Sequence, residues 1–313
     1  MIKSFIDYLA HQKRYSQRTQ LLYEAALSEF FRYAYPELGD LAGLDIEAIT
    51  TVLKNNIIRG YIAQSLENDL SARTVNLHLS ALSSFCNYLI KQGKFKDNPV
   101  RKINRPKESH RLPEFYTENS IEHYFEMKDS DFEGEETMSH LRDRMMIMVL
   151  YATGMRRSEI CKLKVSNFDN SRQVLRIVGK GDKEREIPVP ALICQYILLY
   201  LIRLGKEYSA RSDDYFFLTD KGQALYPAFV NLVVKKELEK AEGFTGRKSP
   251  HVLRHSLATH LLNNGADLNS IKEILGHSSL AATQVYTHNS FEQLRNTYLT
   301  AHPRAKIGGK NGN

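Results

Sequence analysis

Apolar residues recur at intervals of three and four positions through the first ninety residues of the chain. Such spacing places side chains on one face of an α-helix, so this region is predicted to be helical. Ile2, Phe5 and Leu9 begin the pattern, and Asp45 stands where an aspartate would cap a short helix. Helices are expected over residues 2–9, 21–30, 45–49, 57–66 and 71–89.

The pattern changes after residue 115, where two different periods occur. Residues 174–178 alternate and are rich in β-branched side chains, and residues 184–189 follow a Gly-Lys-Gly-Asp turn, which predicts a β-hairpin. A third short strand is expected over residues 215–218. Helical spacing predicts further helices over residues 117–125, 141–151, 191–206, 229–241 and 291–299. The chain is therefore predicted to be mainly α with a small β-sheet, an α+β fold.

Length and charge indicate two domains. The chain has 313 residues, which suits two domains better than one. Residues 91–111 combine eight Lys or Arg residues with two acidic residues and two prolines, which discourage a continuous helix. We divide the chain into a helical N-terminal domain, residues 1–102, a basic linker, residues 103–114, and a second domain, residues 115–313. The formal net charge of +7 favours a polyanionic partner.

The sequence argues against a membrane or secreted protein. Its start, MIKSFIDYLA, lacks the apolar core of a signal peptide, and the longest apolar run, residues 191–202, is too short to span a bilayer. A cytoplasmic protein without membrane contact is therefore expected. The three cysteines are scattered and odd in number, which argues against a disulfide framework: Cys86, Cys161 and Cys194.

No metal or other cofactor is expected. His251, His255 and His260 are close in sequence, but no cysteine or carboxylate completes a tetrahedral ligand set. His255 is interpreted instead as a structural hydrogen-bonding residue. No carboxylate cluster suggests a pair of Mg²⁺ ions.

Residues 251–288 gather side chains suited to binding one phosphate. His251 and Arg254 are three positions apart and would share one helix face. His277 follows in a Gly-His-Ser-Ser turn, and Tyr286 adds an oxygen nucleophile. Each residue also has an ordinary alternative, as a histidine at a helix start, an ion-paired arginine or a core tyrosine.

Two earlier segments supply further cations. Gly154 ends one predicted helix and Ser158-Glu159 opens the next, so Arg156 can approach a ligand from the junction. The hairpin turn carries Lys180, and a lysine there can reach a leaving oxygen in a groove. The alternative for this lysine is a solubilising charge on a surface turn.

These segments together resemble the signatures of the tyrosine site-specific recombinases, most closely the Xer group. The matching patterns are H-x-x-R followed by G-H and Y, T-G-x-R-x-S-E, and G-K-G-x-K-E-R, and the ending AHPRAK favours the XerC branch. Arg157 departs from the pattern, because relatives usually have an apolar residue there. The resemblance implies a SAM-like N-terminal domain that binds the core DNA site, and a catalytic domain that completes a C-shaped clamp. It also implies a C-terminal helix and tail that dock on a neighbouring protomer.

The resemblance further implies DNA cleavage and ligation without metal or ATP. Tyr286 would form a 3′-phosphotyrosyl bond, and Lys180 would protonate the leaving 5′ oxygen to give a free 5′-hydroxyl. His251 would act as acid and base, and His277 would hydrogen-bond the phosphate. The implied catalytic set is Arg156, Lys180, His251, Arg254, His277 and Tyr286.

Contacts with the DNA backbone are expected from three places in the chain. A helix start can receive a phosphate, and a basic linker provides a path for the backbone. The hairpin tip would add a third contact. The expected residues are Arg73, Thr74, Arg101, Lys102, Arg105, Lys107, Lys183 and Arg185.

The expected role is resolution of chromosome dimers at a dif-like site. Four protomers would form the synapse, of this chain alone or with a second Xer-like recombinase, and a cell-division DNA translocase is a possible activator. One alternative is an integrase of a mobile element, although residues 1–20 leave no room for the arm-binding domain that many integrases carry. Another is a catalytically silent DNA-binding regulator, which the presence of all six reactive residue types argues against.

Overall fold

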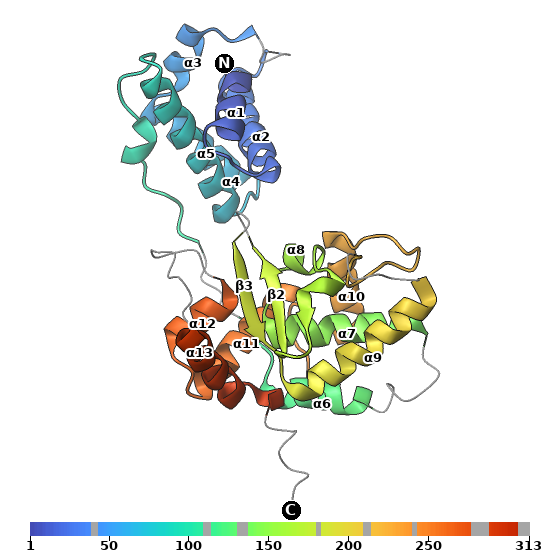
Figure 1. Cartoon of the computed structure of the whole chain (residues 1–313). Helices are drawn as coiled ribbons and strands as arrows, with labels where there is room; N and C mark the ends of the chain where they lie inside the picture. The colour runs from blue at the N-terminus through green and yellow to red at the C-terminus, as the bar shows by residue number, and fades with distance from the viewer. Residues whose placement is uncertain are drawn as a thin grey trace, which may run out of the picture. The chain divides into compact units, whose positions relative to one another are not determined.

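The computed structural model divides the chain into two compact units, Met1–Arg111 and Leu112–Asn313 (Figure 1). The boundary lies within the segment predicted as a linker. The structure describes residues 1–38, 43–108, 114–129, 137–179, 183–208, 214–239, 243–276 and 288–305. None of the described helices is long and apolar enough to cross a membrane.

The N-terminal unit is a helical bundle around an aromatic core. Its elements are α1 (Ile2–His11), α2 (Gln17–Ala34), α3 (Ile46–Val52), α4 (Asn55–Glu67), α5 (Ala72–Lys91) and the short 3-10 helix η2 (Pro99–Lys102). Phe30 meets Tyr61 edge to face, with ring centroids 5.3 Å apart, and Phe5 meets Phe85 at 5.2 Å. Asp45 caps α3 by accepting from the backbone N–H of Ala48. All five predicted helices are present.

Residues 103–108 lie along α5 instead of forming a free linker. Ile103 is buried in the N-terminal core. Arg105 donates to the carbonyl of Asn76 and to the Ser80 hydroxyl, both at 3.1 Å, and the Asn76 amide donates to the carbonyl of Pro106 at 3.0 Å. The basic segment is therefore part of the N-terminal unit at least as far as these contacts reach.

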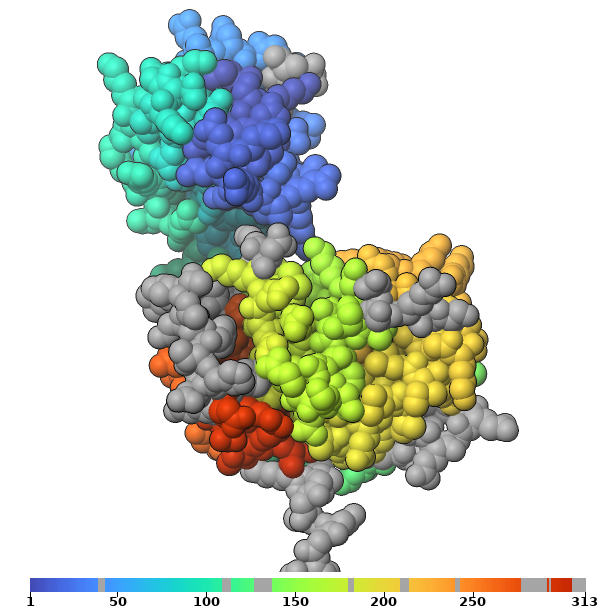
Figure 2. Space-filling model, in the orientation of Figure 1, coloured from blue at the N-terminus to red at the C-terminus, as the bar shows by residue number. Residues whose placement is uncertain are grey.

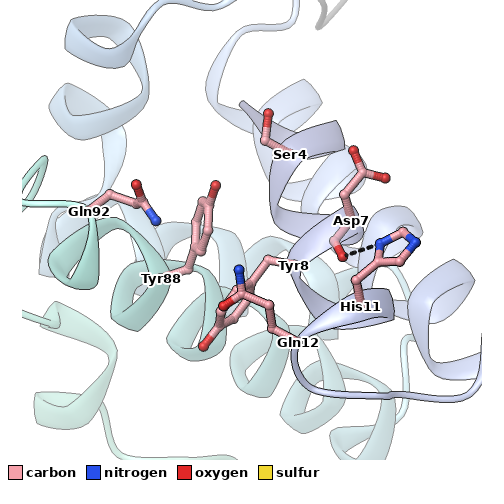
Figure 3. A pocket seen from close by; sticks show the side chains of 7 residues that line it. All are labelled: Ser4, Asp7, Tyr8, His11, Gln12, Tyr88 and Gln92. Carbon is pink, nitrogen blue, oxygen red and sulfur yellow. Dashed lines mark hydrogen bonds between the residues drawn. The ribbon is translucent and has the colours of Figure 1, made fainter.

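The same unit has a shallow hollow between α1 and α5, of about 270 Å³ (Figure 3). Seven mostly polar residues line it: Ser4, Asp7, Tyr8, His11, Gln12, Tyr88 and Gln92. The ring nitrogen Nδ1 of His11 is hydrogen-bonded to the carbonyl of Asp7 within α1. None of the residues predicted to act on DNA lines this hollow.

The C-terminal unit packs helices around a small sheet. Its helices are α6 (Glu118–Asp129), α7 (Met138–Thr153), α8 (Arg157–Ile160), α9 (Ala191–Tyr208), α10 (Pro227–Glu239), α11 (Pro250–Asn263), α12 (Leu268–Leu275) and α13 (His288–Ala301), with the short 3-10 helices η4 (Val165–Asn167) and η5 (Pro303–Ala305). The strands are β1 (Phe168–Asp169), β2 (Val174–Val178) and β3 (Glu184–Pro188).

Helix α7 is the centre of this unit. Every residue from Leu141 to Thr153 is buried, including the charged residues Arg142, Asp143 and Arg144. Buried charges need partners, and Arg142 is paired with Asp143 and with Asp220, both at 2.6 Å. A helix that is covered on all sides has no polar face, so the spacing of its apolar residues does not show how completely it is buried.

The sheet is antiparallel, in the order β1-β2-β3. The predicted hairpin is confirmed, with Val174 opposite Pro188 and Val178 opposite Glu184. The prediction of a third strand over residues 215–218 is wrong, since only isolated bridges form there, at Tyr215 and Leu218. The third strand is β1, whose two residues are too few to give a sequence period.

The described C-terminal segment is packed against its own unit. Leu294, Tyr298 and Ala301 of α13 are buried in the core, and so are His302 and Arg304. Figure 2 shows α13 in red and the strands β2 and β3 in yellow-green at one surface of the unit. The chain is therefore ordered against its own unit through residue 305. Residues 306–313 lie outside the described part.

Candidate active site

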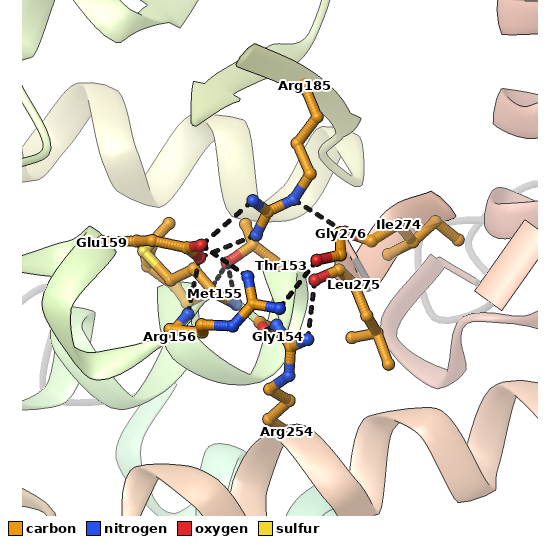
Figure 4. A network of polar contacts seen from close by, with 11 residues as sticks. Thr153, Gly154, Met155, Arg156, Glu159, Arg185, Arg254, Ile274, Leu275 and Gly276 are labelled. Carbon is orange, nitrogen blue, oxygen red and sulfur yellow. Dashed lines mark hydrogen bonds and ion pairs between the residues drawn. The ribbon is translucent and has the colours of Figure 1, made fainter. Parts of the chain in front are cut away.

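Three arginines from three separate segments meet at the C-terminal end of α12 (Figure 4). Arg185 donates to the carbonyl of Ile274 at 3.0 Å. Arg254 donates to the carbonyl of Leu275 at 2.6 Å, and Arg156 to that of Gly276 at 2.7 Å. The last carbonyls of a helix lack intrahelical donors and carry partial negative charge, so they hold the guanidinium groups well. We call Arg156, Arg185, Arg254 and Glu159 the arginine cluster.

Arg156 is positioned by the break between α7 and α8. Gly154 ends α7 in the left-handed region, with φ at 58°. A Cβ at this position would lie 2.5 Å from Leu275 Cδ2 and 3.0 Å from Leu257 Cδ2, so the close approach of α12 also requires glycine. The side chain of Arg156 is 40% exposed, which leaves part of its guanidinium group open to a ligand.

Arg254 reaches the cluster from α11. It is 7% exposed and also donates to the carbonyl of Gly154 at 2.5 Å. Burial, together with the neighbouring Arg156 guanidinium, lowers the pKa of Arg254 to about 10. The group therefore stays cationic at neutral pH, although its positive charge is unfavourable in this place. An anion bound beside the two arginines would relieve that cost.

His251 is exposed in the first turn of the same helix, three residues before Arg254. Ser249 caps α11 by accepting from the N–H of Val252, and Pro250 is the first helical residue, where its missing N–H costs nothing. The local sequence thus fixes the start of α11. The predicted placement of His251 and Arg254 on one helix is confirmed.

Glu159 and Arg185 complete the cluster, and the sequence reasoning gave neither its observed role. Glu159 is 6% exposed and accepts from the backbone N–H and the guanidinium of Arg156. Burial alone would raise the pKa of Glu159, but hydrogen bonds and positive charge from Arg185 and Arg156 outweigh it and lower the pKa. The sequence did contain a signal for the role of Glu159. It is three residues after Arg156, and a glutamate in that position can bind the backbone at a helix start.

The prediction that Arg185 contacts DNA from the hairpin tip is corrected. Arg185 lies within β3 and is 8% exposed, and its guanidinium group binds Glu159 and Ile274 inside the protein. Successive strand residues face opposite sides, and Arg185 shares the inward side with Ile187. Lys183, closer to the tip, is exposed.

Three predicted catalytic residues lie outside the described part of the chain: Lys180, His277 and Tyr286. Described residues directly precede two of them, Lys180 and His277. Gly179 donates to the carbonyl of Lys183 at 2.8 Å across the base of the hairpin, and Gly276 immediately precedes His277. The roles of these three residues remain predictions.

The predicted DNA contacts of the N-terminal unit are mostly at its surface. Arg73 is exposed and Thr74 half-buried in the first turn of α5, which Ser71 caps. Lys102 is exposed but paired with Asp97 at 2.8 Å. Arg101 and Lys107 are also exposed, and Arg105 is exposed while it holds α5.

His260 has a structural role that the sequence analysis did not assign. Its Nδ1 is hydrogen-bonded to the hydroxyl of Tyr151 at 2.8 Å and its Nε2 to the carbonyl of Tyr116 at 2.7 Å. Both ring nitrogens are thus used within the protein. Among the described residues, no group of three or more His, Cys, Asp or Glu side chains could hold a metal ion.

Comparisons with known sequences agree with this geometry. The model of the phage integrase family matches residues 115–293, and the model of the phage integrase N-terminal SAM-like domain matches residues 2–93. The chain is 37% identical to a tyrosine recombinase XerC of Bacillus pumilus over 97% of each chain. It is 34% identical to that of Bacillus subtilis, over 97% of this chain and 96% of the relative.

Solved structures share the fold. The recombinase XerH bound to a palindromic difH substrate has a TM-score of 0.67 at 24% identity, covering 95% of this chain and 83% of its own. The Tn1549 transposon integrase in complex with transposon right end DNA has the same TM-score at 18% identity, covering 93% and 97%. From the matching domains and full-length relatives, the chain belongs to the phage integrase family and is a tyrosine recombinase, an enzyme that cleaves and rejoins DNA through a phosphotyrosine.

Proposed function

We propose that this chain resolves chromosome dimers by recombining two copies of a dif-like DNA site. One observation supports the proposed catalytic geometry. The adjacent carbonyls of Leu275 and Gly276 hold the guanidinium groups of Arg254 and Arg156, respectively. Residues far apart in sequence thereby present two guanidinium groups together, and Arg156 is open to solvent. Two such groups suit the two non-bridging oxygens of a phosphodiester.

The proposed catalytic set is Arg156, Lys180, His251, Arg254, His277 and Tyr286. The hydroxyl oxygen of Tyr286 attacks phosphorus, the bond from phosphorus to the 5′ oxygen breaks, and a 3′-phosphotyrosyl bond remains. Lys180 gives a proton to the leaving 5′ oxygen, and His251 takes the tyrosine proton. Because the phosphotyrosyl bond conserves the energy of the broken bond, religation requires no ATP.

In this proposal, the positive charge at the end of α12 contributes most to the acceleration of DNA cleavage. Charge builds up on the phosphate oxygens during attack, and preorganised cations stabilise it without reorganising. The guanidinium groups of Arg156 and Arg254 are already held by carbonyls and by Glu159 before DNA binds. His277, directly after Gly276, would add a hydrogen bond to the same phosphate.

Support for the Xer role comes from the relatives that match end to end and are named XerC. The fold does not separate a housekeeping Xer enzyme from a transposon integrase, since structures of both kinds have TM-scores of 0.67. The proposal also includes a C-shaped clamp around DNA and a synapse of four protomers, either all of this chain or shared with a second Xer-like recombinase. A cell-division translocase would activate the enzyme, and it would act in the cytoplasm.

The test is to trap the natural substrate covalently. Purified protein is incubated with nicked fragments of its host genome, and the protein-linked DNA ends are sequenced. One chromosomal site, recovered repeatedly, is expected. Ends that map to a mobile element would favour the integrase alternative, and the absence of any protein-linked ends would contradict recombinase activity.

The nucleophile is tested by Tyr286→Phe. This change removes the attacking oxygen and little else, so covalent trapping should be abolished while DNA binding in a gel-shift titration is retained. The matched control is Tyr226→Phe, since Tyr226 is 55% exposed and outside the proposed site. A phosphotyrosyl adduct that survives the change at Tyr286 would disprove this assignment.

A further inference from the structure

Arg185 is held in the arginine cluster by three hydrogen bonds. Its Nη1 and Nη2 donate to the two carboxylate oxygens of Glu159, at 3.2 and 2.7 Å, and its Nε donates to the carbonyl of Ile274 at 3.0 Å. Such bidentate pairs fix both distance and orientation. Arg185 therefore joins three segments, namely strand β3, helix α8 and the end of α12.

Glu159 lies between Arg185 and Arg156. Each of its oxygens accepts one bond from Arg185 and one from Arg156, whose backbone N–H donates at 2.7 Å and whose Nη1 donates at 2.9 Å. A buried carboxylate with a single charged partner would be costly. The bonds from Arg185 therefore let Glu159 stay ionised and hold Arg156. Arg185 can thus act on Arg156 without contacting it.

The guanidinium group of Arg185 also packs closely against two glycines. A Cβ on Gly276, which has φ at 64°, would lie 3.0 Å from Nη1 of Arg185. A Cβ on Gly179 would lie 3.6 Å from the same atom. These glycines directly precede His277 and Lys180 in the chain. Arg185 thus lies beside Gly179 and Gly276, the last described residues before Lys180 and His277.

We infer that Arg185 is a positioning residue for DNA cleavage. It sets Arg156 through Glu159, and it fixes the end of α12 at Ile274 and Gly276, directly before His277. The inference rests on the proposed function. It assigns Arg185 no contact with the phosphate. The signal from the sequence alone, a basic residue on a hairpin, had suggested a contact with DNA instead.

The primary variant is Arg185→Met, which keeps an unbranched side chain in place of the arginine stem and removes the guanidinium group with its charge and donors. Covalent adduct formation is measured in a single turnover on a nicked duplex carrying the trapped site. We expect a loss on the order of 10²-fold, as for a small misplacement of reacting groups, with DNA affinity nearly unchanged. The matched control is Arg172→Met, which breaks another bidentate pair on the same sheet, with Glu186 at 2.8 and 2.7 Å, and should keep the wild-type rate.

The pH profile separates positioning from simple loss of structure. Among the residues that the structure describes, Arg185, Arg156 and Arg254 are the charged groups that face Glu159. Without Arg185, burial of Glu159 is less compensated and its pKa rises, so the variant should lose activity on acidification at a higher pH than wild type. The double variant Glu159→Gln with Arg185→Met has no carboxylate to protonate. Its cleavage activity should not show the shifted loss on acidification, and its cleavage rate should be higher than that of Arg185→Met.

Folding is checked by circular dichroism and thermal melting. If Arg185→Met does not fold, Arg185→Lys carries the test, because lysine keeps the charge but cannot make the bidentate pair. A loss of about tenfold is expected for it. A folded Arg185 variant with wild-type rate and pH profile would overturn the inference alone. A wild-type chain that forms no adduct would overturn the proposed function and, with it, this role.

Discussion

Two clusters of buried polar side chains lie in the C-terminal unit. One holds its side chains in charged form, and the other holds them in neutral form. The arginine cluster holds three guanidinium groups and one carboxylate in charged form, with Arg156 still 40% exposed. A second cluster, which we call the histidine cluster, consists of Tyr151, His260, Tyr298 and His302. Burial lowers the pKa of both histidines, to about 3 for His302, and raises that of both tyrosines.

The difference shows what each cluster is for. The histidine cluster is neutral at physiological pH, so its hydrogen bonds only join elements of the core. The arginine cluster keeps an excess of positive charge in a partly buried place, and the cost of that charge falls when an anion binds beside it. The two clusters meet at the end of α7, where Ala152 accepts from the Tyr298 hydroxyl and Gly154 accepts from Arg254.

The largest effect that separates the clusters is expected from Arg254→Lys. Lysine keeps the charge but cannot bind the carbonyls of Gly154 and Leu275 and a phosphate together. Single-turnover cleavage should fall by about 10²–10³-fold, as when one preorganised donor is removed. Melting temperature and gel-shift affinity should change little. A variant that cleaves at the wild-type rate would show that the buried arginine serves the fold.

The two clusters also illustrate how much of the fold and of the candidate site the sequence could predict. Helices with one apolar face were located from their spacing, and the family motifs pointed to Arg156 and Arg254. The motifs did not show that α7 is buried on all sides, because that depends on neighbours from distant parts of the chain. Arg185 was assigned to DNA because its charge was considered without the alternation of the strand, which places it on the inward side with Ile187.

The next effect is the pH dependence of stability that the histidine cluster contributes. His302 is fully buried, faces Arg304 and His260, and has a folded-state pKa of about 3, whereas the unfolded value is about 6.5. The unfolded chain therefore binds the extra proton first. Stability from His302 is complete above pH about 6.5 and is lost on acidification towards pH about 3, by up to about 1.4 kcal/mol per pH unit.

His302→Asn tests this dependence. Asparagine can accept the backbone N–H of Arg304 that Nδ1 of His302 accepts at 3.2 Å, but it does not titrate. Free energies of unfolding from urea titrations at several pH values should fall less steeply for the variant than for wild type below pH about 6.5. Carboxylates contribute equally to both proteins and cancel in the difference. Parallel curves would show that His302 does not stay neutral in the fold.

The smallest effect is expected where the clusters meet, from Tyr298→Phe. The change removes the hydroxyl that donates to the carbonyl of Ala152 and leaves that carbonyl buried near the end of α7. The cost should be about 1–3 kcal/mol of unfolding free energy. Tyr200→Phe is the matched control, because its buried hydroxyl donates to the carbonyl of Phe216 at 2.9 Å, away from the arginine cluster. Similar losses of stability with unchanged cleavage in both variants would mean that the clusters work independently, whereas a slower cleavage rate for Tyr298→Phe alone would show that the end of α7 transmits the position of α13 to Arg254.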